Sequence, residues 1–376
     1  MSDAAASEDA RSLRGVALVF LKLGVIGFGG PAAHVALMRR EIVERRRWVS
    51  EKRFLELFGA ANLIPGPSST ELGMMLGYEH GGWPGLLVSG VCFIVPAMSI
   101  VLVLAALYVR YGSTPQTGWV LYGVGPVIIA VIVDALWQLG RRALASAPMI
   151  ALAVAVFTLY LAGVEPVLLL FGAGVVVMLV RNAERMRSSS AVLLPIPLVA
   201  AGPSLGSIFL EFLKLGAVVY GSGYVLLAFL RSDLVERLHW VTSKQLVDAV
   251  AIGQVTPGPV FTTATFIGYL IRGFAGGLVA TAGIFLPAFV LSAIVYTMLP
   301  RLRRSPWAAA FLDGVTVGGL GLMAGVTLQL GRIVLADVAT VVLAVVAFVV
   351  LRRYQPNSAW LVLGGAALGV VRGLVS

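Results

Sequence analysis

The stretch Phe-Leu-Lys-Leu-Gly at residues 20–24 occurs again at residues 212–216, 192 positions later. A second motif, Pro-Gly-Pro at residues 65–67, returns with the same spacing at residues 257–259. At this offset, 18 of the 51 positions from residue 20 to residue 70 are identical without a gap, well above chance. Farther along the chain the offset becomes 191 and the match continues. Two copies of one unit, each broken by glycine and proline at the same place, are typical of transporters whose site lies at the repeat interface.

The composition is that of a polytopic membrane protein. Hydrophobic residues make up 59% of the 376 residues and charged residues only 12%, and the mean hydropathy is +0.94. Soluble domains are about one quarter charged. The net charge of +10 comes from short basic clusters between apolar stretches without interleaved aromatic residues. It therefore indicates membrane topology and excludes nucleic acid as a partner.

The sequence predicts no metal site, no other cofactor and no enzymatic centre. The three histidines lack metal-ligand spacing, and the single Cys92 excludes an intrachain disulfide. The chain shows no arrangement of a nucleophile beside a base and no phosphate-binding loop of an ATPase. The first apolar run, residues 16–38, is too long for the core of a signal peptide, so we expect no cleaved leader.

The apolar stretches predict six helical segments in each half. Those of the first half are residues 16–38, 54–78, 82–109, 117–139 and 148–180, the last divided into two at 163–166. Those of the second half are residues 207–230, 245–270, 274–299, 310–331, 333–351 and 358–375. The predicted fold is an all-α polytopic membrane protein with two tandem homologous repeats, residues 12–187 and 207–376, joined by a linker at 188–206.

The distribution of basic residues predicts that the two repeats are inverted. The loop at residues 39–53 holds seven lysines and arginines, whereas its counterpart at 231–244 holds three. In a later pair of loops the bias is reversed. Because basic loops favour the cytoplasm, equivalent loops would face opposite sides. This requires that 54–78 and 245–270 enter the membrane and return at Pro-Gly-Pro, with residues 39–53 cytoplasmic. The alternative is two parallel halves with twelve full crossings.

The two Pro-Gly-Pro motifs predict an anion site. The half-helix that follows each motif would begin with free N–H groups and a positive dipole end. Hydroxyl side chains come next, namely Ser68, Ser69 and Thr70 in the first copy and Thr262 and Thr263 in the second. Such groups at a helix N-terminus bind anions. The site would also include the turns themselves, Pro65, Gly66, Pro67, Pro257, Gly258 and Pro259. Alternatively, each proline only kinks a packed helix whose hydroxyls bond back to the previous turn.

Lys22 and Lys214 stand at equivalent positions within apolar segments. A lysine deep in a bilayer costs roughly 2.5–3.5 kcal/mol on insertion scales, so such residues usually face a partner or a substrate. Two inward cations facing two half-helix dipoles would suit a dianion. Alternatively, the lysines extend to the membrane surface.

Glycines and titratable residues near these motifs complete the candidate site. Gly29 and Gly30, like residues 220–223 in the second copy, break the first helix, either for the approach of an anion or for close helix packing. The candidates for proton coupling, each with a structural alternative, are Glu71, Glu56, Asp248 and His34. Glu56 and Asp248 are equivalent positions, whereas Glu71 and His34 have no counterpart of their kind in the second copy.

Three motifs together resemble the chromate ion transporter family in its long, two-domain form. They are Phe-Gly-Gly-Pro-x-x-His at residues 28–34, Trp-Val-Ser-x-x-x-Phe at 48–54 and Pro-Gly-Pro-x-x-Thr-Glu-Leu at 65–72. The resemblance implies export of chromate, a tetrahedral dianion, across the cytoplasmic (inner) membrane, coupled to the proton-motive force and giving chromate resistance. The second copy departs from the pattern, which makes the first half the better candidate for contacts with the substrate.

The resemblance leaves several alternatives open. A carrier of another anion, such as sulfate or an organic acid, is one alternative, and an integral-membrane enzyme or accessory subunit is another. The expected partners are an oxyanion and membrane lipid, and the sequence leaves a homodimer open.

Overall fold

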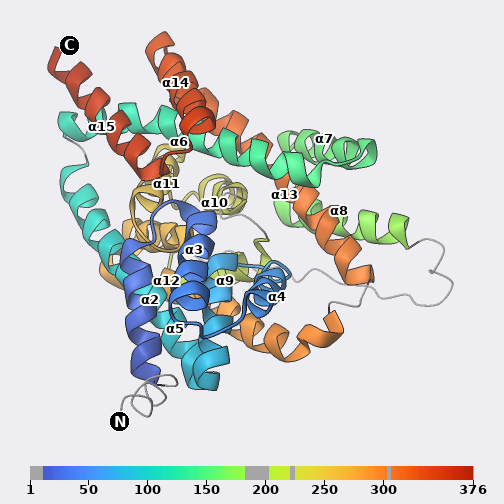
Figure 1. The fold of residues 1–376 in the computed structure, drawn as a ribbon. Helices are drawn as coiled ribbons and strands as arrows, with labels where there is room; N and C mark the ends of the chain where they lie inside the picture. Colours follow the sequence, from blue (N-terminus) through green and yellow to red (C-terminus); the bar gives the residue numbers. More distant parts are fainter. Residues whose placement is uncertain (1–11, 113, 183–202, 221–224, 303–305, 376) are drawn as a thin grey trace.

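The computed structural model describes residues 12–112, 114–182, 203–220, 225–302 and 306–375, and these are almost entirely helical (Figure 1). Most of the predicted linker, and Gly221, Ser222 and Gly223 of the second break, lie outside the described residues. The two predicted repeats are visible in the order of the helices.

The helices of the first repeat have direct counterparts in the second. The first repeat consists of α2 (Leu13–Ile26), α3 (Gly30–Met38), the π-helical turn η2 (Arg39–Arg45), α4 (Glu51–Ala61), α5 (Ser68–Tyr111), α6 (Pro115–Ala143), α7 (Ala147–Leu161) and α8 (Pro166–Arg181). The second consists of α9 (Leu205–Val218), α10 (Leu226–Leu230), η4 (Arg231–Arg237), α11 (Ser243–Val255), the short η5 (Val260–Thr262), α12 (Thr263–Leu302), α13 (Pro306–Val334), α14 (Val338–Tyr354) and α15 (Ser358–Val375). The predicted break of the first helix beside Gly29 and Gly30 is confirmed, since α2 ends at Ile26 and α3 begins at Gly30, and the predicted division at 163–166 is confirmed as well.

Within the described residues, four helices are long and apolar enough to cross a membrane. They are Ser68–Tyr111, Gly118–Arg141, Val260–Thr297 and Ala309–Val334. They form two equivalent pairs, one helix of each pair from each repeat. The chain is therefore a multi-pass membrane protein.

The long helix α5 folds back on itself near its first third. Gly81 and Gly82 leave helical geometry, Gly82 with φ 60° and ψ −149°. In a straight helix, Gly77 and Gly85 would lie about 12 Å apart. Instead, a Cβ at Gly77 would collide with the carbonyl oxygen of Gly85, and a Cβ at Gly85 with that of Gly77. Residues 68–80 thus form a short helix that packs against the start of the next one.

Helix α12 folds back at the equivalent place. Gly273 has φ 61° and ψ −153°, and the glycines in close approach are Gly268 and Gly276. Both folds fall at the gaps between the apolar stretches predicted from sequence. Residues 51–61 and 68–80 span only about 16 and 20 Å, less than the roughly 30 Å of a bilayer core. These lengths agree with a segment that turns inside the membrane, which remains a prediction.

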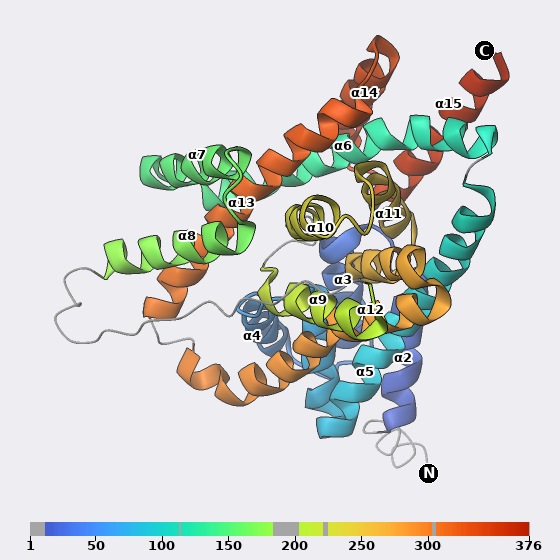
Figure 2. The ribbon, with the colours of Figure 1, turned by 180° about the vertical axis from the view of Figure 1, so that it is seen from behind.

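The repeats are interlocked. Helix α2 packs on α5 and α9 on α12, and α5 packs on α12 at the centre. The last two helices of each repeat, however, pack on the other repeat. Helices α7 and α8 lie against α13, whereas α14 and α15 lie against α6 (Figures 1 and 2). Glycines permit this close contact, because a Cβ at Gly314 would lie 2.8 Å from the Cα of Gly174 and one at Gly123 would collide with the carbonyl group of Gly365. Neither repeat therefore contains a complete core.

Candidate functional site

Each Pro-Gly-Pro turn binds the broken first helix of the opposite repeat. The Gly66 amide donates a hydrogen bond of 2.7 Å to the carbonyl oxygen of Val219. The Gly258 amide donates one of 2.8 Å to the carbonyl oxygen of Gly27. Donors and acceptors are both separated by 192 residues, so the two bonds are equivalent under the repeat. The predicted turns are therefore brought together with the predicted breaks across the repeat interface.

The two central glycines are required by local geometry. Gly66 has φ 129° and Gly258 has φ 88°, both in the region that side chains disfavour. A Cβ at Gly258 would lie 2.7 Å from the Cβ of Ala97, and one at Gly66 would collide with the Glu71 carboxylate. Because proline has no N–H group, the glycine between the two prolines supplies the amide donor of each turn.

The short helix after the first turn presents uncapped donors. Helix α5 begins at Ser68 with Pro67 as its N-cap, and no side chain caps it. The amides of Thr70 and Glu71 bond to the Pro67 carbonyl oxygen. The amides of Ser68 and Ser69 point out of the helix end, where the dipole is positive. Such an end is suited to an anion.

One hydroxyl of the first copy, that of Thr70, is left without a partner among the described residues, while those of the second copy are bonded. Thr70 is fully buried, and its Oγ1 has no hydrogen-bond partner among the described residues. By contrast, Thr262 Oγ1 donates to the Pro259 carbonyl oxygen and Thr263 Oγ1 to that of Val260, each at 2.8 Å. The alternative of hydroxyls bonding back to their own turn thus describes the second copy. Of the two turns, the first therefore carries the free hydroxyl donor.

His34 connects the two halves of this arrangement. Its Nε2 donates to the Gly27 carbonyl oxygen at 2.8 Å, and its Nδ1 lies 3.2 Å from Ser69 Oγ. Because a neutral imidazole that donates from Nε2 accepts at Nδ1, the Ser69 hydroxyl donates to it. The Gly27 oxygen therefore accepts from both His34 and Gly258. His34 is 2% exposed and holds the first break against the start of α5.

Glu71 is the most unusual group at the site. It is fully buried, and neither carboxylate oxygen has a hydrogen-bond partner among the described residues. It lies against Gly66 and interacts electrostatically with Tyr220. A buried carboxylate without partners is costly unless it binds a proton or a ligand group. Of the four candidates for proton coupling, Glu71 is the one whose surroundings leave its carboxylate unsatisfied.

Lys22 and Lys214 have carboxylate partners from their own repeats. Lys22 Nζ lies 2.9 Å from Glu41, and Lys214 Nζ lies 2.5 Å from Glu211 and 2.7 Å from Asp233. Burial raises the pKa of Glu41, but hydrogen bonds from Lys22 and Arg46 outweigh it and lower the pKa to about 2. The structure thus places both lysines in ion-pair clusters, and the direct donors at the turns are amides and hydroxyls.

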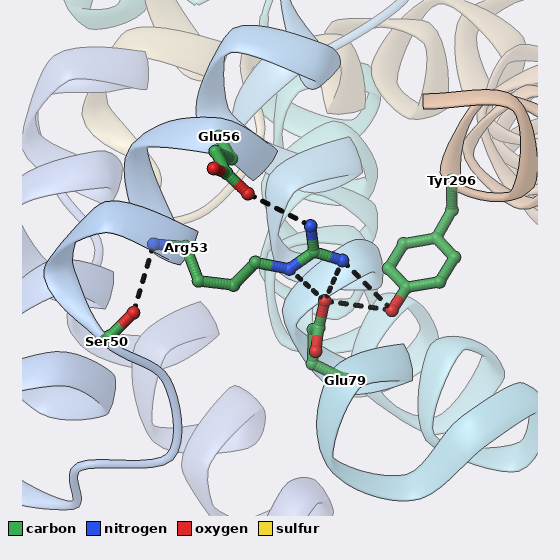
Figure 3. A network of polar contacts seen from close by, with 5 residues as sticks. All are labelled: Ser50, Arg53, Glu56, Glu79 and Tyr296. Atoms are coloured by element: carbon green, nitrogen blue, oxygen red, sulfur yellow. Dashed lines mark hydrogen bonds and ion pairs between the residues drawn. The ribbon is translucent and has the colours of Figure 1, made fainter. Parts of the chain in front are cut away.

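Asp248 connects α11 to the opposite repeat directly, whereas Glu56 binds Arg53 of α4, which in turn contacts the opposite repeat. In the first repeat, Arg53 Nη1 lies 3.1 Å from Glu56 and its Nη2 2.5 Å from Glu79. Tyr296 of α12 donates to the same Glu79 at 2.8 Å (Figure 3).

In the second repeat, Tyr108 of α5 donates to Asp248 at 2.6 Å. Both carboxylates have strong local partners, which indicates a role in holding the repeats together.

The glycines of the first break have different surroundings. Gly29 and Gly30 have φ 103° and 78°, and they start α3. A Cβ at Gly29 would meet Ala33 at 3.2 Å, whereas Gly30 has open space around it. If Gly30 served close helix packing, a neighbouring helix would occupy this space. The space is open, so Gly30 leaves room for a ligand.

Two residues at the site were not identified from the sequence. The Tyr220 hydroxyl donates to the Leu63 carbonyl oxygen, and Tyr220 forms a β-bridge with Pro65. Ser292 is fully buried with no partner for its Oγ among the described residues, one turn beyond Ala288, which faces Gly66. Tyr220 lies in the glycine-rich break noted above, but Ser292 carries no signal in the sequence.

Hydrogen-bond donors surround the first Pro-Gly-Pro turn, which is held in place by the second repeat through Val219. No group of three or more His, Cys, Asp or Glu residues in the described part of the chain is arranged to hold a metal ion. Amides, hydroxyls and a helix dipole can bind an oxyanion without a metal.

Comparison with known proteins gives consistent relatives. The sequence model described as "Chromate transporter" matches residues 15–178 and 206–370. The chain is 34% identical over 369 residues to the chromate transport protein of Cupriavidus metallidurans, covering 95% of this chain and 92% of the relative. It is 37% identical over 353 residues to a probable chromate transport protein of Synechococcus elongatus, covering 90% of each chain. It is 31% identical over 334 residues to the chromate transport protein of Pseudomonas aeruginosa, covering 84% of this chain and 80% of the relative. No solved structure matches.

Proposed function

The chain belongs to the chromate transporter family, and from this premise we propose that it exports chromate across the cytoplasmic membrane, driven by the proton-motive force. Two relatives are named as a chromate transport protein and a probable chromate transport protein, and this chain covers nine tenths of each. The proposal extends the named substrate to this chain and adds the direction and the driving force.

The observation that carries the proposal is the buried, unpartnered hydroxyl of Thr70 at the uncapped start of α5. The oxygens of a chromate dianion accept hydrogen bonds and donate none. The Ser68 and Ser69 amides and the Thr70 hydroxyl are donors from three consecutive residues at the start of one helix. Ser292 adds a further hydroxyl on the helix face next to Gly66. We assign these groups as the direct ligands of the anion.

The reciprocal hydrogen bonds of Gly66 and Gly258 suggest how access would alternate. Each turn is held by the other repeat, so a rotation of one repeat against the other moves both turns together. The interlocked last helices would keep the repeats associated during this motion. We propose that the site lies near the middle of the membrane and opens to each side in turn.

The membrane potential favours this direction of transport. Moving one charge across the membrane is worth about 2.3 kcal/mol per 100 mV, so a dianion that leaves a negative interior gains roughly twice that. Glu71 would add control by protons, since its carboxylate form repels a dianion beside Gly66 and its protonated form can donate a hydrogen bond to it. Protonation of Glu71 and occupancy by the anion are therefore linked.

The test is the flux of radiolabelled chromate into everted membrane vesicles, with and without a proton-motive force. We expect uptake that collapses when the force is dissipated, and weaker uptake of labelled sulfate. Vesicles from cells that lack the protein serve as the control. If vesicles containing the protein take up chromate no faster than vesicles without it, the proposed function is wrong.

A further inference from the structure

The two repeats contain equivalent charge clusters with different net charge. In the first, Lys22, Arg45 and Arg46 surround the single carboxylate of Glu41 at 2.9, 3.0 and 3.1 Å. Its three cations and one anion leave a surplus of two positive charges.

The second cluster is neutral. Lys214 and Arg237 bind the two carboxylates of Glu211 and Asp233, at distances from 2.5 to 3.2 Å. Two substitutions make the difference. Val19 of the first repeat corresponds to Glu211, and Arg46 corresponds to Leu238.

The surplus charge lies beside an apolar surface. Leu18, Leu21 and Val25 of α2 are 57%, 38% and 52% exposed, and the Lys22 side chain between them is 44% exposed. In a multi-pass membrane protein, exposed leucine and valine on one helix face contact acyl chains. Lys22 lies within this lipid-facing stripe, and the cationic cluster therefore borders it.

An aromatic group fixes the cluster at this boundary. The Arg46 guanidinium lies 5.5 Å from the centre of the Trp48 ring, and Trp48 stacks on His80 at 3.8 Å. Tryptophan is typical of the level of the lipid headgroups. The side chains of Arg45 and Arg46 remain 61% and 41% exposed, so their unused N–H groups are accessible.

We propose that the Glu41-centred cluster of the first repeat binds the phosphate group of an anionic phospholipid, whose acyl chains lie along Leu18, Leu21 and Val25 of α2. Arginine pairs recognise phosphate oxygens through directed hydrogen bonds, and lysine adds a point charge. The headgroup neutralises the surplus charge that Glu41 leaves. The second repeat, with its neutral cluster, does not bind such a lipid. This assignment does not depend on the transported substrate.

The chain supplies matched variants for a test. Arg46→Leu places the residue of the second repeat in the first cluster, and Leu238→Arg makes the converse change. Arg46→Lys keeps the charge and serves as the control for folding. The purified full-length proteins would be titrated with phosphatidylglycerol or phosphatidylcholine in detergent, and bound lipid counted by native mass spectrometry.

We expect the wild-type protein to retain phosphatidylglycerol in preference to phosphatidylcholine. Arg46→Leu should weaken this retention about fivefold, the factor for one basic residue at an anionic surface. Arg46→Lys should retain most of it, and Leu238→Arg should add binding. Equal retention by wild type and Arg46→Leu would overturn the proposal. Displacement of the lipid by millimolar inorganic phosphate or chromate would also overturn it, because the cluster would then receive a free oxyanion.

Discussion

The Glu71 carboxylate lies against Gly66, in the space that a β-carbon on Gly66 would occupy. The turn and the titratable group are thus in direct contact, so a movement of the Gly66 backbone also displaces the Glu71 carboxylate. Several predictions about transport depend on this contact and on the hydrogen bonds around it.

Gly66→Ala should abolish chromate transport and lower the stability of the protein. The φ of 129° is unfavourable for alanine, and the new methyl group would displace Glu71. Such a change costs more than about 1 kcal/mol. Flux and thermal unfolding in detergent check it, with Gly172→Ala as the matched control because that glycine has open space around it. Wild-type flux in Gly66→Ala would contradict the assigned geometry.

Thr70→Val should weaken chromate binding by about 1–2 kcal/mol, the cost of one lost hydrogen bond in a buried site. Stability should stay the same or rise, because the change removes a buried hydroxyl that has no partner among the described residues. The matched control is Thr262→Val, since that hydroxyl already donates to the Pro259 carbonyl oxygen. The measurement is the KM of chromate uptake in everted vesicles. If both variants raise KM equally, the first repeat has no special role.

Glu71→Gln should flatten the pH dependence of transport. In the wild type, the ionised Glu71 repels the dianion, so flux should decline as the pH rises. The amide is neutral at every pH. His34 and Tyr220, the other titratable groups around the site, are unchanged in the variant. Protonation of the anion itself affects both proteins equally. Parallel pH profiles of initial rates would exclude Glu71 as the coupling group.

Glu41→Gln should destabilise the protein at neutral pH and have less effect in acid. The folded-state pKa of about 2 lies below the ordinary value of 4.5, so the carboxylate stabilises the fold above pH 4.5. This contribution, at most about 3 kcal/mol and reduced by solvent at the exposed cations, is lost as the pH falls from 4.5 towards 2. Thermal unfolding of both proteins between pH 3 and 7 measures it. A constant difference across that range would show that Glu41 is not the titrating group.

Cysteines introduced at Ser50 and Thr242 should be labelled from opposite sides of the membrane. These equivalent residues precede α4 and α11, and an odd number of crossings in each repeat would invert the second. The background should lack Cys92, the single native cysteine. A membrane-impermeant thiol reagent applied to whole cells should label the position at 242 and spare the one at 50. Labelling of both to the same extent would support parallel repeats.

The repeat, its breaks and its turns could be predicted because glycine, proline and hydrophobic runs report local backbone geometry. The hydrogen-bond partner of each turn could not be predicted. An offset of 192 identifies Gly66 with Gly258, but it does not say that Gly66 bonds to Val219 of the other repeat. Similarly, the apolar flanks of Lys22 suggested a cation facing a substrate. Its partner Glu41 lies 19 residues away, beyond the range of helix periodicity, and only the packing of η2 on α2 brings the two together.

The exchange of terminal helices has a consequence for how the protein is made. Helices α7 and α8 are synthesised with the first repeat, yet they pack on α13, which ends at Val334. At roughly 5–20 residues per second, the ribosome needs on the order of ten seconds or more to deliver α13 after α8 has emerged. During this interval the faces of α7 and α8 that pack on α13 must wait in the bilayer without their partner. Insertion of this chain is thus a process in which the first half becomes complete only when the second arrives, and a stalled or truncated product would expose that face to membrane quality control.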